Sequence, residues 1–443
     1  MAVASSTIAI GENERAGSAA ATWHPIQLLV LSLCFLINAL DGMDVLIMSY
    51  VAPALAREWN LNPSTLGIVF SAGLAGMMVG SIIVAPLADR LGRRRMILAS
   101  MGTMTVAMIL TGLAESVLQL VAARFVVGIG IGTVLASMAA LTAEYAPARH
   151  RALAVSLLQA GYPLGAVATG FACVWSIPMF GWQATLIGAG LLSAVAFPLI
   201  YALLPESLEF LLRSHRTGTL ERVNRINRRL GRPLMTSLPA RSETTITSFS
   251  FKTLLSAENR AATLFAWGGI FCSFMVLYFV ISWIPKLAVE AGLEQSKAII
   301  AGALYNIGAF CGTFLIGILS VRFQLQRLIA CFLITAAVTL VIFGSVALPL
   351  FALLAVAFLM GASVQGGFNG YYPLVTLLYP SEVRSTGLGW AIGIGRTGAI
   401  FGPLLGGWLL SYGTPLPILF GIFAVPLLIA AVCALSVRKR SQP

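Results

Sequence analysis

Long apolar runs separated by short polar segments dominate the pattern along this chain. A helix needs about 20 mainly apolar residues to cross the hydrocarbon core of a bilayer. Inside that core every backbone polar group must be satisfied within the segment, so such runs are typical of spanning α-helices. We count twelve runs, near residues 26–51, 65–88, 95–115, 118–140, 152–176, 183–204, 261–285, 298–320, 326–346, 349–374, 386–411 and 414–436.

A polar segment divides the runs into two sets of six. Part of it, "ERVNRINRRLGRP", has helical spacing and predicts a helix along the membrane surface. We therefore expect five parts: an N-terminal tail (1–25), a six-helix bundle (26–204), a cytoplasmic linker (205–260), a second six-helix bundle (261–436) and a C-terminal tail (437–443).

The two halves repeat at an offset of 232 residues, which aligns residues 76–98 with 308–330. Secondary transporters are built from internal repeats of this kind, with the substrate site near the bilayer midplane. The predicted fold is an all-α membrane protein of twelve transmembrane helices in two pseudo-symmetric six-helix bundles. The coinciding positions are Gly76/Gly308, Gly80/Gly312, Leu87/Leu319, Arg90/Arg322, Arg95/Arg327 and Ile97/Ile329.

Charge is scarce and unevenly placed. Only 10% of the 443 residues are charged, and the net charge is +12. With the N-terminus inside, most of the 28 Lys and Arg fall in cytoplasmic segments, which is the positive-inside bias. We expect a plasma-membrane protein with both termini in the cytoplasm, and the excess of positive charge indicates topology rather than a nucleic-acid partner.

The sequence offers little support for enzyme chemistry. The six Cys are scattered, and the three His lie outside the predicted spans, so we expect no metal and no cofactor. No nucleophile–base constellation is present. "GIGRTG" at 393–398 matches a dinucleotide-binding pattern but lacks the preceding strand. The polar first 25 residues do not suggest a cleavable signal peptide.

Two carboxylates stand within the first apolar run, in "NALDGMDVLI". Asp41 and Asp44 lie at i and i+3, so they share one face of a helix. A charge at bilayer depth costs several kcal/mol and marks a candidate functional site, because an acid that desolvation drives toward its neutral form can serve as a proton-coupling site. Arg124 in the fourth span lies at a similar depth and could pair with Asp44, in a coupling or a purely structural ion pair.

A third unusual charge, Arg396, lies in the middle of the eleventh span. A guanidinium can bind a carboxylate in bidentate fashion, so Arg396 is a candidate anchor for a substrate carboxylate; a structural pairing with a span-1 Asp is the alternative. At the repeat offset, Asp41 corresponds to Ser273 and Asp44 to Val276. Because scaffold features should repeat and these do not, they are better explained by function.

The sequence "LADRLGRR" at 87–94, preceded by Gly80, resembles the loop signature of the major facilitator superfamily, with Ala85 at a position usually held by Gly. In that family the motif caps helix ends on the cytoplasmic side and stabilises the outward-open state. A topogenic charge cluster is the alternative. The expected cytoplasmic gate comprises Asp89, Arg90, Gly92, Arg93, Arg94, Glu144 and Arg151.

Two further motifs narrow the resemblance. "RFVVGIG" at 124–130 is similar to a superfamily pattern associated with proton coupling. "LDGMD" at 40–44 together with "GIGRTG" at 393–398 resembles the aromatic acid:proton symporters. This resemblance implies import of a small aromatic carboxylate (benzoate, hydroxybenzoate or a related aryl acid) with protons, by alternating access in a bacterial inner membrane. It also implies that both acids matter for uptake and that Arg396 matters for the substrate carboxylate.

Aromatic and polar residues on other spans could complete a pocket. Rings would stack on an aryl substrate and amides would bind its hydroxyls, although each residue could equally serve helix packing or anchoring at the membrane interface. The candidates are Gln159, Tyr162, Tyr278, Tyr305, Asn306, Phe368, Asn369, Tyr371 and Trp390.

The expected partners are thus the aromatic carboxylate, protons and the lipid bilayer, with the protein acting as a monomer. Three alternatives remain open at this point: a symporter for another organic acid or a sugar, a proton-coupled exporter, and a transporter-like sensor that binds its ligand without moving it.

Overall fold

The computed structural model describes residues 23–214, 218–238, 255–256, 260–290, 292–346, 348–379 and 381–437. The described part is helical and contains no strand. Most of the predicted N-terminal tail, almost all of the C-terminal tail and much of the linker lie outside the described residues. For residues 381–386 only the backbone is described.

The first bundle contains four separate spanning helices and one longer helix. The spanning helices are α2 (Pro25–Glu58), α3 (Pro63–Val79), α5 (Arg93–Gly112) and α6 (Val117–Tyr145). A π-helical turn (Gly80–Val84), a 3-10 turn (Ala85–Leu87) and the short α4 (Ala88–Leu91) continue α3. After the turn Ala148–His150, α7 runs from Arg151 to Leu203.

The long helix α7 crosses the bundle twice. It breaks at Gly181, whose φ of 80° and ψ of 173° are not helical. A positive φ is accessible to glycine without steric cost, so the chain can turn back at this point. The described part of the chain contains eleven helices that are long and apolar enough to span a membrane. Because α7 is broken at Gly181 and crosses twice, these eleven helices give twelve crossings. The predicted number of spans is confirmed.

The linker contributes two short helices, α8 (Leu208–Ser214) and α9 (Thr219–Arg229). The second of these confirms the helix predicted for "ERVNRINRRLGRP". The second bundle consists of six helices: α11 (Arg260–Glu290), α12 (Gln295–Leu319), α13 (Leu325–Ser345), α14 (Leu350–Leu378), α15 (Ser381–Ser411) and α16 (Leu416–Ser436).

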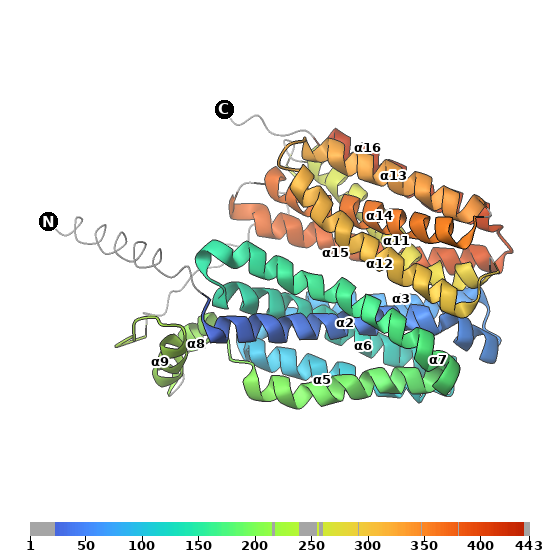
Figure 1. Cartoon of the computed structure of the whole chain (residues 1–443). Helices are drawn as coiled ribbons and strands as arrows, with labels where there is room; N and C mark the ends of the chain where they lie inside the picture. Colours follow the sequence, from blue (N-terminus) through green and yellow to red (C-terminus); the bar gives the residue numbers. More distant parts are fainter. Residues whose placement is uncertain are drawn as a thin grey trace.

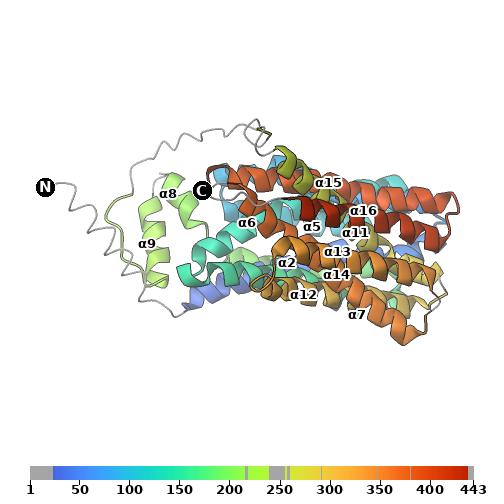
Figure 2. The ribbon, with the colours of Figure 1, turned by 90° about the horizontal axis from the view of Figure 1, so that it is seen from above.

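The two bundles lie side by side with their helices roughly parallel to a common axis (Figures 1 and 2). The helices α8 and α9 lie beyond one end of this assembly. We call this the linker end, and the other the far end. Between the bundles, α2 packs on α11, α3 on α15, and α7 on α12.

Glycines of the internal repeat allow the same close helix–helix contact in both bundles. A Cβ at Gly76 of α3 would collide with the backbone carbonyl of Phe125 in α6, and a Cβ at Gly308 of α12 would collide with that of Phe358 in α14. Small residues allow helix backbones to approach closely in a membrane. The repeat read from the sequence therefore corresponds to a repeated helix–helix contact.

Candidate functional site

Contacts between the bundles gather at the far end. The Oγ of Ser49 in α2 donates to the carbonyl of Ile281 in α11 (2.7 Å). The Oγ of Ser71 in α3 donates to the carbonyl of Ile400 in α15 (2.8 Å), and Arg57, in the last turn of α2, donates to the side chain of Gln295 in α12. These bonds hold the bundles together on the far side of the midplane.

A cavity of about 620 Å³ lies between the bundles. Its lining includes Asp41 and Arg396, near the middle of their helices, and continues to Ile318. Ile318 is next to the last residue of α12, so the cavity extends toward the linker end. The structure thus has its bundles closed together at the far end and a cavity reaching toward the other.

The two acids of α2 are buried without partners. Asp41 and Asp44 are each 1% exposed, and none of their carboxylate oxygens has a hydrogen-bond partner among the described residues. Asp41 lines the cavity, whereas Asp44 is not part of its lining. A buried carboxylate without a partner is costly while it is charged, which is the property expected of a site that binds and releases a proton.

Arg124 lies against the same helix. It is 5% exposed, and one of its terminal nitrogens donates to the backbone carbonyl of Asp44 (3.0 Å). The predicted neighbours are therefore brought together, but the contact is to the backbone rather than to the carboxylate. No ion pair between Arg124 and either acid occurs in the described part.

The glycine of "LDGMD" has a steric role. A Cβ at Gly42 would collide with the backbone carbonyl of Tyr162, so this glycine allows α2 and α7 to touch. Nearby, the amide of Asn38 donates to the carbonyl of Leu158 (2.7 Å). These two contacts bring α7 against α2, and Tyr162 lines the cavity together with Asp41.

Among the described residues that line the cavity, Arg396 of α15 is the only arginine, and it is half-buried. No described carboxylate lies within ion-pair distance of its guanidinium, and in particular neither acid of α2 does. The structural pairing considered as an alternative is therefore not formed in this conformation. The guanidinium is available to an anion inside the cavity.

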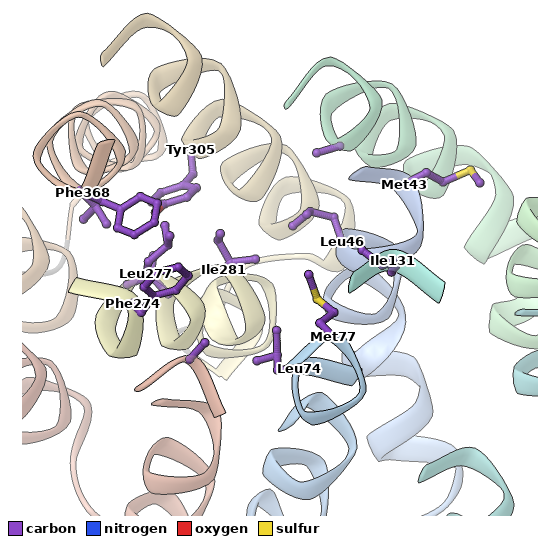
Figure 3. Packing of buried hydrophobic residues seen from close by; sticks show 14 of the residues in the cluster. Met43, Leu46, Leu74, Met77, Ile131, Phe274, Leu277, Ile281, Tyr305 and Phe368 are labelled. Atoms are coloured by element: carbon purple, nitrogen blue, oxygen red, sulfur yellow. The ribbon is translucent and has the colours of Figure 1, made fainter. Parts of the chain in front are cut away.

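Amides and rings of the second bundle line the rest of the cavity. Asn369 donates to the Oγ1 of Thr313 (2.7 Å), and Gln365 lies one helical turn before Asn369 on α14. Phe274 meets Phe368 edge to face, with ring centroids 4.6 Å apart. Figure 3 shows these two rings among the apolar side chains contributed by both bundles.

The structure places most of the predicted pocket residues together. Six line the cavity with Arg396, namely Gln159, Tyr162, Tyr278, Asn306, Phe368 and Asn369. Three lie outside the lining. Tyr305 is buried, Tyr371 donates its hydroxyl to the carbonyl of Ala430, and Trp390 is 46% exposed.

Sequence reasoning missed several lining residues, among them Asn38, Thr313, Gln365 and Tyr372. A signal for one of them was present. Gln365, Asn369 and Tyr372 lie at i, i+4 and i+7, which is a single helix face, whereas Tyr371 falls on another face of α14. Helical spacing from Asn369 would therefore have selected the correct tyrosine.

The expected gate residues form a network inside the first bundle. Arg93, the first residue of α5, pairs with Glu144 of α6 and with Glu209 of α8 (3.0 Å). Glu144 also accepts a hydrogen bond from the Oγ of Ser207 (2.8 Å). The network therefore ties two spanning helices to the start of the linker.

Two neighbours of Arg93 strengthen this connection. The backbone N–H of Arg94 donates to Glu206 (2.9 Å), and its side chain donates to the carbonyl of Leu204 (2.7 Å). Gly92 has a φ of 103°, and a Cβ there would lie 2.6 Å from a carboxylate oxygen of Glu206. The motif thus needs glycine at position 92 for both backbone conformation and space.

The other three gate residues, Asp89, Arg90 and Arg151, have exposed side chains. They take part in no ion pair with a described carboxylate or cation.

Among the residues that the structure describes, no group of three or more His, Cys, Asp or Glu could hold a metal ion.

The chain matches the Major Facilitator Superfamily over residues 34–327 and again over 266–443. The chain belongs to the major facilitator superfamily. Its predicted fold is thereby confirmed, and the family places it among transporters rather than enzymes.

Similar proteins and structures agree with this family. The chain is 33% identical to a gallate transporter of Pseudomonas putida, covering 94% of each chain. It is 32% identical to a 4-hydroxybenzoate transporter of Acinetobacter baylyi, covering 92% of this chain and 90% of the relative. It is 30% identical to a benzoate transport protein of the same species, covering 94% and 90%. A bacterial homologue of the human lysosomal transporter Spinster has the same fold, with a TM-score of 0.74 at 17% identity, covering 95% and 98% of the two chains.

Proposed function

We propose that this protein imports a small aromatic carboxylate together with protons by alternating access. The observation that carries the proposal is the cavity between the bundles, whose lining contains the Arg396 guanidinium, the buried Asp41 carboxyl group and aromatic rings. Neither Arg396 nor Asp41 forms an ion pair with a described residue, and the Asp41 oxygens accept no hydrogen bond there. Relatives that cover nearly the whole chain are transporters of gallate, 4-hydroxybenzoate and benzoate, which supports an aryl acid as the cargo.

In this proposal the substrate carboxylate docks on Arg396. A planar guanidinium forms two parallel hydrogen bonds with a carboxylate, and no described acid competes for it. The ring of the substrate lies among Phe274, Phe368 and Tyr278, whose edges and faces suit an aromatic partner. Asn369 and Gln159 offer polar groups to ring hydroxyls, and Tyr162 and Asn306 complete the wall.

Asp41 and Asp44 are the proposed proton carriers, with Arg124 as the neighbouring cation. An inside-negative potential opposes entry of an anion by about 2.3 kcal/mol per charge per 100 mV. One co-transported proton removes this opposition, and two make the potential a driving force. Protonation also removes the charges that burial penalises, so loading of the acids favours closure of the bundles around them.

We place the linker end in the cytoplasm, because most of the described Lys and Arg residues outside the middle of the spans lie at this end, whereas Arg57, Lys286 and Lys297 lie at the far end. The conformation with its cavity toward this end is then inward-facing. The gate residues around Arg93 and Glu144 would hold the first bundle rigid as it moves, and Asp89, Arg90 and Arg151 would contact the second bundle when the inner end closes. One chain encloses the whole cavity, so a monomer is sufficient for transport.

The experiment uses purified protein in liposomes with a trapped pH dye and an imposed proton gradient. Benzoate, hydroxybenzoates and gallate are added in turn, with an aliphatic acid and a sugar as controls. We expect an aryl acid to move protons inward through the wild type, and Asp41→Asn to lose accumulation. Glu115→Gln, which changes an exposed carboxylate in the loop before α6, is the matched control and should behave as the wild type.

Two results would contradict the proposal. Proton movement with the aliphatic acid or the sugar alone would reject the aromatic substrate. Wild-type accumulation in Asp41→Asn would reject the coupling role. A sensor would bind an aryl acid without any flux, so binding measured by isothermal titration separates that possibility from transport.

A further inference from the structure

A second cavity, of about 520 Å³, lies at the linker end, between the linker helices and the beginning of α5. It is separate from the cavity between the bundles and shares no lining residue with it. Its apolar lining residues include Ile26, Phe210 and Ile226. Its described lining also contains five arginines.

Four arginines line the cavity without a salt-bridge partner among the described residues. Arg222, Arg225 and Arg229 lie at i, i+3 and i+7 on α9 and therefore share one helix face, and Arg95 belongs to α5. All four are exposed, and none forms an ion pair with a described carboxylate. The cavity thus concentrates positive charge from two elements that are far apart in the sequence.

The carboxylate and the fifth arginine of the lining are already engaged. Glu206 accepts hydrogen bonds from the backbone N–H groups of Arg94 (2.9 Å) and Ser207 (3.0 Å). The side chain of Arg94 donates to the carbonyls of Leu204 (2.7 Å) and Tyr201 (2.5 Å) and lies over the ring of Tyr201. Neither group forms an ion pair with the arginines on α9, so these arginines are available to an anion from outside the described residues.

The depth of the cavity indicates the chemistry of that anion. Arg95 is the third residue of α5, a membrane-spanning helix, and so stands at the level of the polar headgroups. Several arginines around one space favour phosphate, because the guanidinium fork binds its oxygens in pairs. Basic pockets at the cytoplasmic ends of spanning helices bind anionic lipid headgroups by the same chemistry.

We propose that this cavity is a binding site for a phosphate-bearing anion, held between Arg95 of α5 and the arginine face of α9. The phosphate comes either from the headgroup of an anionic phospholipid or from a soluble phosphate. Bound there, it bridges the linker to a spanning helix, next to the network of Arg93, Glu144 and Glu209.

The full-length protein is tested by native mass spectrometry from micelles that contain phosphatidylglycerol and phosphatidylcholine. The variant Arg222→Gln/Arg225→Gln/Arg229→Gln removes the arginine face of α9. Arg95→Gln alters the opposite wall. Arg228→Gln is the matched control, because Arg228 is exposed on the same helix but does not line the cavity. Size-exclusion profiles of all variants report whether the chains are folded.

We expect the wild type to retain phosphatidylglycerol in preference to phosphatidylcholine, and the triple variant to lose about tenfold of that preference, equivalent to about 1.4 kcal/mol. Arg95→Gln should lose a part of it and Arg228→Gln none. To separate the two sources, delipidated protein is heated with inorganic phosphate or pyrophosphate. Retention of the lipid without thermal stabilisation by these ions identifies a headgroup site. Arg-dependent stabilisation by the ions without lipid retention identifies a soluble phosphate.

Three outcomes would overturn the proposal. The wild type could prefer neither phosphatidylglycerol nor phosphate. Arg228→Gln could lose as much binding as the triple variant, which would indicate general surface charge. Arg95→Gln could bind as the wild type does, which would show that the anion does not occupy the space between α5 and α9.

Discussion

Replacement of Gly67 by alanine should shift this protein away from the conformation described here. Gly67, near the beginning of α3, faces α15 across the boundary between the bundles. A Cβ at this position would lie 2.7 Å from the carbonyl oxygen of Pro403 and 3.3 Å from the Cα of Gly407. Both are backbone atoms within a helix, so they cannot move aside without separating α3 from α15.

The size of the effect follows from the contact. Overpacking a well-packed interface costs about 1–3 kcal/mol. Since Gly67 belongs to one bundle and Pro403 to the other, this cost applies only while the far end is closed. A difference of 1.4 kcal/mol is tenfold in an equilibrium constant, so the ratio of far-end-closed to far-end-open protein should fall by about 5- to 150-fold.

Double electron–electron resonance measures this ratio, because it gives the distribution of distances between two spin labels. Suitable positions are Glu115 and Tyr412, which are exposed in far-end segments of different bundles, in a background without native cysteines. Gly67→Ala should increase the population at long distances. Gly421→Ala in α16 is the control, because a Cβ there meets nothing within 4 Å. An unchanged distance distribution in Gly67→Ala would refute the view that this contact distinguishes the two states.

Three other substitutions test the cavity and the network. Arg396→Lys keeps the positive charge but loses the bidentate geometry. Since one hydrogen bond to a charged group contributes about 1.5–3 kcal/mol, the half-saturating concentration of an aryl acid in liposome uptake should rise about 10- to 150-fold. An unchanged value would show that Arg396 does not bind the substrate. Asn369→Leu should weaken uptake of hydroxylated acids about fivefold and spare benzoate, and equal losses for both would argue against a contact with ring hydroxyls. Glu144→Gln leaves Glu209 as the remaining described carboxylate that pairs with Arg93. Breaking a fully buried pair lowers the free energy of unfolding by about 3–5 kcal/mol; because Arg93 and Glu144 are each 15% exposed, we expect a loss of about 1–3 kcal/mol, measured as a lower midpoint of thermal unfolding. An unchanged midpoint would show that the network adds no stability.

Much of the fold was accessible from the sequence because the membrane restricts the choices. A spanning segment must satisfy its own backbone, so a run of apolar residues is sufficient to predict a helix. The internal repeat could also be recognised from the sequence, because Gly76 and Gly308 are needed at equivalent helix contacts in the two bundles. The break of α7 at Gly181 also fell within the short interval, residues 177–182, expected between the fifth and sixth spans.

The unusual charges were also visible in the sequence. Asp41, Asp44 and Arg396 stand out because charge is expensive at bilayer depth and is retained only for a reason. Their number and spacing do not depend on the rotation of any helix. What these positions face could not be read from the sequence, and the expected Asp44–Arg124 contact proved to involve the backbone of Asp44.

By itself, then, the sequence determined the class of the protein, the number and approximate positions of its spanning helices, their repetition, and the residues whose charge demands an explanation. Only the tertiary structure decided that Tyr372 rather than Tyr371 lines the cavity, that Arg93 and Glu144 bond within one bundle, and that the far end is closed. The physical reason is that helix formation in a membrane is a local requirement of the backbone. The rotation of each helix and the relative position of the two bundles depend on contacts between residues that are distant along the chain.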